Sequence, residues 1–170
     1  MQILKYFMLF LILVACSLIG RIVSKKYINR VKELEEFKNA LNIFETKIRF
    51  TYEPIPKIFS EISQNTSKNI GQIFKTAKEK MKDINANTSW EQSVDEVKNL
   101  ELTKEDKYVL KTLAKELGQT DVEGQVSQIK MTKTFLETQI KEAKEIRYKN
   151  EKMYNKLGTI VGLAIVIILF

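Results

Sequence analysis

The chain has 170 residues and a formal net charge of +7, but residues 34–143 carry 17 basic and 18 acidic side chains, so the excess lies in the two ends. A nucleic-acid-binding domain would carry a basic surface on its folded part, and we therefore expect no nucleic acid as a partner. Histidine is absent and Cys16 is the only cysteine, which excludes zinc sites of the Cys/His kind, an internal disulfide and histidine-based catalysis.

None of the six glycines lies in a glycine-rich phosphate-binding motif, so the sequence predicts no nucleotide site. Acidic residues are plentiful, but hydrolysis by a carboxylate pair needs two carboxyl groups facing one pocket. No spacing in the sequence singles out such a pair. We therefore predict that the protein is not an enzyme and that it has no cofactor and no metal.

The first predicted element is an apolar segment at residues 1–23, which is long enough to cross a bilayer as a helix. Positive charge follows it, and this bias holds the next part of a chain in the cytoplasm. The basic residues on this flank are Arg21, Lys25, Lys26 and Arg30. We expect an N-terminal transmembrane helix with the following domain on the cytoplasmic side.

A different interpretation of the same segment stays open. Leu13-Val-Ala-Cys16 has the four-residue pattern of a lipoprotein signal, in which the chain is cleaved before a cysteine that becomes lipid-modified. The chain would then be a lipid-anchored extracytoplasmic helical binding protein. Against it, the apolar run continues beyond Cys16, and only Lys5 marks the N-terminal side. A cysteine placed at Ser89 would decide between the two through its reaction with an impermeant thiol reagent.

Residues 24–152 are predicted as one cytoplasmic domain of helices without strands. Apolar residues recur at helical spacing from Tyr27 to Ile48. The run Glu53-Pro-Ile-Pro56 ends this helix, because proline lacks an amide hydrogen and disfavours helix in the residue before it. Two shorter amphipathic helices are expected at residues 57–63 and 70–84, and a loop at residues 85–89.

Capping patterns predict the next three helix starts. The runs Thr88-Ser-Trp-Glu91 and Thr120-Asp-Val-Glu123 have the spacing of a capping box, and Leu102-Thr-Lys-Glu-Asp106 starts the helix between them. Gly118 lies at the end of the fifth predicted helix, where a glycine in the left-handed conformation commonly forms the C-terminal cap. Trp90, the only tryptophan, is interpreted as a core residue at a helix start rather than as a platform for a ligand.

The last helix is expected to begin in water and to end in lipid, in a second membrane segment at residues 153–170. From Leu157 the remaining apolar run spans about 21 Å as a helix against about 30 Å of hydrocarbon, so this segment is short. The basic residues before it are Lys144, Arg147, Lys149, Lys152 and Lys156. We predict an all-α protein, a bundle of about six helices with one N-terminal and one short C-terminal transmembrane helix.

Small residues recur four positions apart in both apolar segments, which lets helix backbones approach closely. The spacings are Cys16-x-x-x-Gly20 and Gly158-x-x-x-Gly162. They predict helix packing at Cys16, Gly20, Gly158 and Gly162, either between the two segments or with the segments of a partner.

The run Lys149-Asn-Glu-Lys-Met-Tyr-Asn-Lys-Leu-Gly158 resembles the ending of the stage III sporulation protein AB (SpoIIIAB) family of endospore-forming bacteria. The first apolar segment, its basic flank and the proline elbow resemble the same family, although Glu53 stands where the family usually has threonine. The resemblance covers the whole chain. Its motif residues are Asn150, Glu151, Lys152, Met153, Leu157, Gly158, Trp90 and Pro54.

The resemblance implies more than the residue patterns do. Members of this family have a helical domain similar to the cytoplasmic domains of the GspF-type platform protein of type II secretion. They are thought to belong to the SpoIIIA–SpoIIQ type channel between mother cell and forespore, beside a secretion-type ATPase, SpoIIIAA. The resemblance therefore implies a membrane platform in the mother-cell membrane around the forespore. Its partners would be other channel proteins, including the ATPase, and homo-oligomers are compatible with it.

No contact residue follows from the resemblance. The charged faces of the fourth and fifth helices are the first surface to test for ATPase binding, because they lie farthest in sequence from both membrane segments. This face comprises Glu91, Asp95, Glu101, Lys104 and Glu105. The alternative for each of them is an exposed charge with no function.

Overall fold

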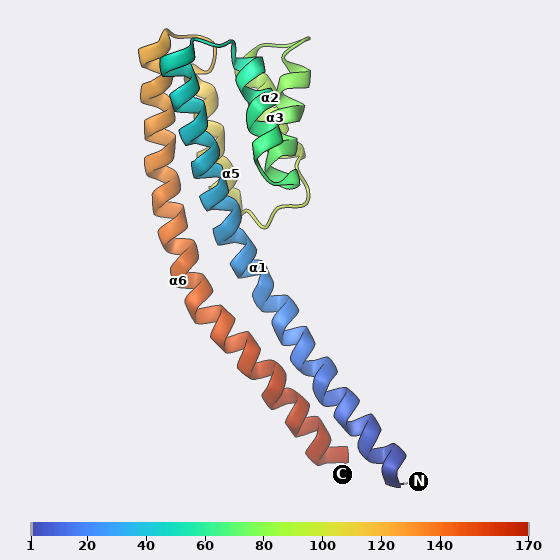
Figure 1. The fold of residues 1–170 in the computed structure, drawn as a ribbon. Coiled ribbons are helices and arrows are strands. Elements are labelled where there is room, and N and C mark those ends of the chain that lie inside the picture. The colour runs from blue at the N-terminus through green and yellow to red at the C-terminus, as the bar shows by residue number, and fades with distance from the viewer. Residues whose placement is uncertain (1, 170) are drawn as a thin grey trace. The chain divides into compact units, whose positions relative to one another are not determined.

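The computed structural model describes residues 2–169, and Met1 and Phe170, which end the two predicted membrane segments, lie outside the described residues. Within that range the chain forms six α-helices and one 3-10 helix, and no strand (Figure 1). The all-α prediction is confirmed. The elements are α1 (Gln2–Thr51), α2 (Ile55–Asn65), α3 (Lys68–Lys80), α4 (Ala86–Glu96), α5 (Lys104–Lys111), the 3-10 helix η1 (Thr112–Glu116) and α6 (Val122–Leu169).

The chain divides into two compact units. Unit 1 contains the outer parts of α1 and α6, up to residue 31 and from residue 142 onward, and unit 2 contains residues 32–141. Both predicted membrane segments therefore belong to unit 1, together with residues 24–31 and 142–152 of the predicted cytoplasmic domain. The boundaries of the membrane segments depend on lipid and stay predictions.

The proline elbow ends α1 as predicted. Pro54 is the N-cap residue of α2 and its carbonyl accepts a hydrogen bond from the amide of Lys57 at 2.9 Å. Just before it, Tyr52 has a φ of 53°, in the left-handed region that side chains other than glycine rarely adopt. The chain can therefore turn sharply within three residues, and α2 begins two residues earlier than the predicted position 57.

Two of the predicted helix starts are wrong by one to three residues. Asn85 caps α4, because its side chain accepts from the amide of Thr88, so the predicted loop at residues 85–89 is largely helix. Asp121 caps α6 by accepting from the amide of Gly124 at 2.9 Å, and the hydroxyl of Thr120 donates back to the carbonyl of Glu116 at 3.4 Å. Asn and Asp are at least as good at N-caps as Thr, so the sequence offers adjacent candidates between which only the folded chain selects.

The other two local signals are confirmed. Thr103 and Asp106 form a complete capping box, in which the hydroxyl of Thr103 accepts from the amide of Asp106 at 3.1 Å and the carboxylate of Asp106 accepts from the amide of Thr103 at 2.8 Å. Gly118 has a φ of 74°, the left-handed conformation that a glycine adopts without steric cost. The predicted fifth helix therefore begins and ends where the sequence indicates, but it is an α-helix only to Lys111 and continues as the 3-10 helix η1.

The core of unit 2 is built around Trp90, which is fully buried. Its ring centroid lies 5.1 Å from that of Phe74, 5.5 Å from that of Phe59 and 6.3 Å from that of Phe37. Its indole nitrogen donates to the carbonyl of Leu110 at 2.8 Å. Because these rings come from α1, α2, α3 and α4, this one side chain joins the three short helices to the long helix α1.

Unit 2 also contains two ion pairs between α1 and α6. Lys38 lies 2.6 Å from Glu137, and Lys133 lies 2.8 Å from Glu45. Both helices carry an apolar face that is buried in this unit, as the periodicity predicts. The buried apolar residues of α1 are Leu34, Phe37, Ala40, Leu41, Phe44 and Ile48, and those of α6 are Val126, Ile129, Leu136 and Ile140.

Candidate functional site

The two apolar helices of unit 1 meet through glycines. A Cβ atom built on Gly20 would lie 2.5 Å from the carbonyl oxygen of Tyr154 and 3.2 Å from the Cα of Gly158. A Cβ on Gly158 would lie 2.7 Å from the carbonyl oxygen of Cys16. Real Cβ atoms do not approach backbone this closely, so only glycine permits this backbone contact at positions 20 and 158.

The contact continues one helical turn further along each helix. A Cβ on Gly162 would lie 3.2 Å from the Cβ of Cys16 and 3.4 Å from the Cα of Leu13. The structure thus brings together all four residues that the sequence singles out for helix packing, and their partners lie within the same chain. Close packing of backbones stabilises helix pairs in lipid, because lipid tails are as apolar as the side chains and no hydrophobic effect drives the helices together.

A polar and aromatic pair lies next to the glycine contact. The hydroxyl of Ser24, which is buried, donates to the side-chain oxygen of Asn155 at 3.2 Å. The rings of Tyr27 and Tyr154 stack, with centroids 5.9 Å apart and an angle of 15° between their planes. The sequence reasoning missed these four residues, because neither Ser nor Tyr shows from sequence which residue on another helix it contacts.

Both long helices are candidates for crossing a membrane. The most apolar part of α1 is only 17% buried and that of α6 only 6% buried. The corresponding helix of a soluble core would be mostly covered by protein. The exposed apolar residues include Phe7, Phe10, Ile19 and Ile22 on α1 and Ile160, Leu163, Ile167 and Ile168 on α6. A lipid environment accounts for this exposed apolar surface.

The predicted membrane-flanking basic residues fall into two groups. Arg30 is 7% exposed, so it is buried in protein and does not offer its charge to lipid headgroups. Arg147 pairs with Glu151 at 2.9 Å along α6, and the ammonium of Lys152 lies 4.0 Å from the centre of the Tyr148 ring. All of them except Arg30 and the half-buried Arg147 are exposed: Arg21, Lys25, Lys26, Lys144, Lys149, Lys152 and Lys156.

The predicted partner face on α4 and α5 is only partly free. Glu91, Lys104 and Glu105 are exposed, whereas the exposed Asp95 forms an ion pair with Lys111 at 2.6 Å. Glu101 is only partly exposed, and its amide donates to the carboxylate of Glu33 on α1 at 2.7 Å. The segment between α4 and α5 is therefore anchored to α1 at Glu101, which leaves Glu91, Lys104 and Glu105 as the accessible part of this face.

Glu33 is the ionisable group of unit 2 whose environment changes its proton affinity most clearly. Partial burial disfavours its charged form, and the neighbouring carboxylates of Glu101, Glu36 and Asp106 add repulsion, while the hydrogen bond from the Glu101 amide opposes both. The net effect raises the pKa of Glu33 from 4.5 to about 7. The sequence does not reveal the raised pKa, because Glu101 and Asp106 are far from Glu33 in the chain and come close to it only in the folded protein.

We expect Glu33→Gln to remove a pH dependence from the stability of unit 2. A carboxyl whose pKa is raised on folding binds its proton more tightly in the folded state, so the wild-type chain loses stability as pH rises from about 4.5 to about 7. Because this carboxyl is only partly buried, water screens its interactions, and we expect an effect of about 1 kcal/mol rather than the full amount the shift implies. Urea unfolding of the full chain in nonionic detergent, followed by Trp90 fluorescence, should show Glu33→Gln more stable than wild type at pH 8 and similar to it at pH 5.

Glu105→Gln is the matched control for this prediction, because it also removes one acidic charge but lies on the exposed face of α5. It should follow the wild-type pH dependence. An unchanged difference between pH 5 and pH 8 in Glu33→Gln would show that this carboxyl does not titrate in the folded protein.

The motif residues serve different structural roles. Trp90 is in the core and Pro54 caps α2, as described above. Asn150 donates to the carbonyl of Ile146 at 2.8 Å, and Glu151 pairs with Arg147 on the same helix. Met153 and Leu157 are exposed, whereas Gly158 lies in the glycine contact.

Comparison with known proteins agrees with this architecture. The sequence model of the family described as Stage III sporulation protein AB matches residues 5–170. The chain belongs to the stage III sporulation protein AB family. Its relative of that name in Bacillus subtilis (strain 168) is 29% identical over 161 residues, which cover 93% of this chain and 94% of the relative.

A solved structure of stage III sporulation protein AB (SpoIIIAB) is similar as well. It has a TM-score of 0.66 and 25% sequence identity, and the match covers 71% of this chain and 97% of the solved one. The resemblance found in the sequence is thus confirmed. The relatives of this chain are named as sporulation proteins and not as enzymes.

Proposed function

We propose that this chain is a non-enzymatic membrane platform in a channel of the SpoIIIA–SpoIIQ type between mother cell and forespore. Two apolar helices would hold it in the mother-cell membrane around the forespore, and residues 24–152 would face the mother-cell cytoplasm. The observation that carries the proposal is the glycine contact of Gly20 with Gly158. It joins the apolar helices at the two ends of one polar domain, so that both ends of that domain would be anchored at the same bilayer.

The orientation is supported by charge. Exposed basic residues lie at the end of each apolar segment that is nearer to the domain. They are Arg21, Lys25 and Lys26 at the first segment and Lys149 and Lys156 at the second. Lysine and arginine in this position keep a domain in the cytoplasm. Residues 34–143 are nearly neutral, so the excess positive charge of the chain is concentrated next to the apolar segments.

A secretion-type ATPase of the SpoIIIAA kind is the partner we propose for the domain, together with other channel proteins. It is supported by the family assignment and by the absence of a phosphate-binding motif in this sequence, which suits a protein that transmits rather than generates motion. The accessible part of the α4–α5 face, Glu91, Lys104 and Glu105, is the surface proposed for this contact.

Thiol labelling tests the orientation. The position suggested by the sequence, Ser89, is fully buried and would not react in either orientation. Glu105→Cys is exposed and replaces it, in a Cys16→Ala background that removes the native thiol. In growing cells of a Gram-positive host, where only one membrane separates cytoplasm from medium, an impermeant maleimide should leave this thiol unmodified until the cells are permeabilised.

Labelling in intact cells would overturn the proposed orientation and favour the lipid-anchored, exported alternative at Cys16. That alternative requires cleavage within α1, which is a continuous helix through Cys16. The partner is tested separately. The tagged full chain in detergent should retain the SpoIIIAA-like ATPase of the same organism, and the combined variant Glu91→Lys, Glu105→Lys should lose it.

A further inference from the structure

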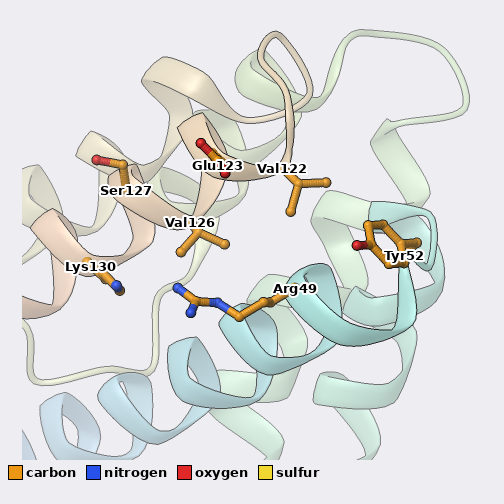
Figure 2. Close-up of a pocket in the computed structure, with 7 residues that line it drawn as sticks. All are labelled: Arg49, Tyr52, Val122, Glu123, Val126, Ser127 and Lys130. Carbon is orange, nitrogen blue, oxygen red and sulfur yellow. The ribbon is translucent and has the colours of Figure 1, made fainter.

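Unit 2 contains a groove of about 600 Å³ between the end of α1 and the start of α6 (Figure 2). A volume of this order accommodates a few side chains of a ligand. The lining residues are Arg49 and Tyr52 at the end of α1, and Val122, Glu123, Val126, Ser127 and Lys130 on α6. None of them belongs to the α4–α5 face.

Two positive charges meet in this groove. Figure 2 shows the guanidinium of Arg49 and the ammonium of Lys130 pointing toward the same space beside Val126. Arg49 lies 3.6 Å from a carboxylate oxygen of Glu45, which is longer than the roughly 2.7–2.9 Å of a charge-assisted hydrogen bond. The other oxygen of Glu45 is 2.8 Å from Lys133, so this carboxylate is shared.

Lys130 makes no ion pair with any residue that the structure describes. Glu123, the one acidic residue of the lining, leaves the groove with two basic groups against one acidic group. Two like charges that converge without a full counterion repel each other, and an anionic group placed between them would relieve the repulsion. The groove therefore has the electrostatic character of a carboxylate site.

The rest of the lining combines the apolar and aromatic side chains of Val122, Val126 and Tyr52 with the hydroxyl of Ser127. Val126 is 6% exposed and forms a buried part of the wall, whereas Tyr52 is 76% exposed and lies at the end of the groove away from Lys130. Phe50, two residues before Tyr52, is 71% exposed. Tyr52 is held in the left-handed backbone region, which residues other than glycine rarely adopt. Tyr52 and Phe50 therefore place exposed aromatic surface at this end of α1.

We propose that this groove binds a segment of a partner protein in which a carboxylate lies next to an apolar or aromatic side chain. The carboxylate lies between Arg49 and Lys130, and the apolar side chain packs on Val126 and Tyr52. A symmetric contact with a second copy would face Arg49 and Lys130 with the same two charges and is disfavoured. The inference goes beyond the proposed platform function, because it does not depend on which protein meets the α4–α5 face.

Zero-length cross-linking tests the contact directly. A carbodiimide joins an amine to a carboxylate that touches it, so it reports on Lys130 and not on Arg49. In membranes of sporulating cells that produce the tagged full chain, peptide mass spectrometry should find Lys130 joined to an aspartate, a glutamate or a C-terminal carboxylate of another protein, adjacent to an apolar residue. Arg49→Ala should lower the yield of this product roughly ten-fold, because it removes one of the two charges that hold the carboxylate.

Two variants make the result specific. Lys130→Arg removes the amine and keeps the charge, so it should abolish the cross-link while the same partner still co-purifies with the chain. Lys115→Arg, an exposed lysine outside the groove, should leave the cross-link at Lys130 unchanged. Trp90 fluorescence in each variant confirms that unit 2 is folded.

The proposal is overturned if Lys130 yields no product with another protein, if it is joined only to its own chain or to a second copy, or if Arg49→Ala leaves the yield unchanged. Failure here and failure of the platform proposal are distinguishable. The labelling of Glu105→Cys reports the side of the membrane whatever occupies the groove.

Discussion

Replacing Trp90 by alanine is expected to lower the free energy of unfolding of unit 2 by about 3–5 kcal/mol, the range for removal of a large buried aromatic side chain. Trp90 is fully buried and packs against Phe37, Phe59 and Phe74. Its loss would leave a cavity among rings that belong to four helices, and it would also leave the Leu110 carbonyl without its indole donor. A domain of ordinary stability, about 5–15 kcal/mol, would lose a large part of its margin.

Circular dichroism at 222 nm during urea unfolding measures this effect, because the variant has no tryptophan fluorescence. Trp90→Phe separates the two contributions: it keeps an aromatic ring in the site and removes the hydrogen bond, so we expect a smaller loss of about 1–3 kcal/mol. Tyr108→Ala is the matched control, since Tyr108 is an aromatic residue of α5 that is 70% exposed. Equal midpoints for Trp90→Ala and Tyr108→Ala would contradict the role of Trp90 in the core.

Replacing Gly158 by leucine is expected to separate the two apolar helices. A Cβ at this position would lie 2.7 Å from the backbone oxygen of Cys16, which cannot move aside like a flexible side chain. Helix pairs in lipid depend on this close backbone packing, because no hydrophobic effect drives them together there. We therefore expect the distance between Cys16 and Gly162 to increase as well, since both lie on the same contact.

The native thiol of Cys16 provides the measurement. A Cβ at Gly162 would lie 3.2 Å from the Cβ of Cys16, close to the spacing of about 3.5–4.5 Å in a disulfide, so Gly162→Cys should form an intramolecular disulfide on mild oxidation in membranes. Alkylation with a maleimide-linked polymer should then add no mass to a monomeric band before reduction and two tags after it. Adding Gly158→Leu should reduce this disulfide to a minor fraction.

Two controls accompany the measurement. Thr159→Leu enlarges the neighbouring residue, which is exposed and outside the glycine contact, and should leave the disulfide intact. Cys16→Ser should abolish it. A disulfide that forms between chains rather than within one, and that persists in Gly158→Leu, would assign the small residues to a partner's helices instead.

The sequence left open whether the two apolar helices contact each other or the helices of a partner. The spacings Cys16-x-x-x-Gly20 and Gly158-x-x-x-Gly162 define a surface on each helix, but no pattern within one helix says whether that surface meets the other helix of the same chain or a helix of another protein. The pairing of Ser24 with Asn155 and of Tyr27 with Tyr154 could not be predicted for the same reason.

The sequence by itself determined the elements whose causes are local. Pro54 ends α1 because proline lacks an amide hydrogen and disfavours helix in the residue before it, and Pro56 lies in the first turn of α2, where no amide is needed. The Thr103 and Asp106 box needs only neighbouring residues, and Gly118 adopts the left-handed conformation that other residues avoid. The apolar periodicity of α1 and α6, the near-neutral centre and the order of the motif residues likewise belong to the chain alone. They predicted the all-α class, the candidate membrane helices and the family.

Only the tertiary structure decided what depends on contacts between distant residues. Asn85 rather than Thr88 caps α4, Ser89 and Arg30 are buried, Glu101 is held by Glu33, and Arg49 meets Lys130 across a groove. In each of these the alternatives have similar local energies, so packing against another helix selects among them. Burial and the potential of neighbouring charges depend on three-dimensional surroundings, which is why the raised pKa of Glu33 and the positive groove were beyond the reach of residue patterns.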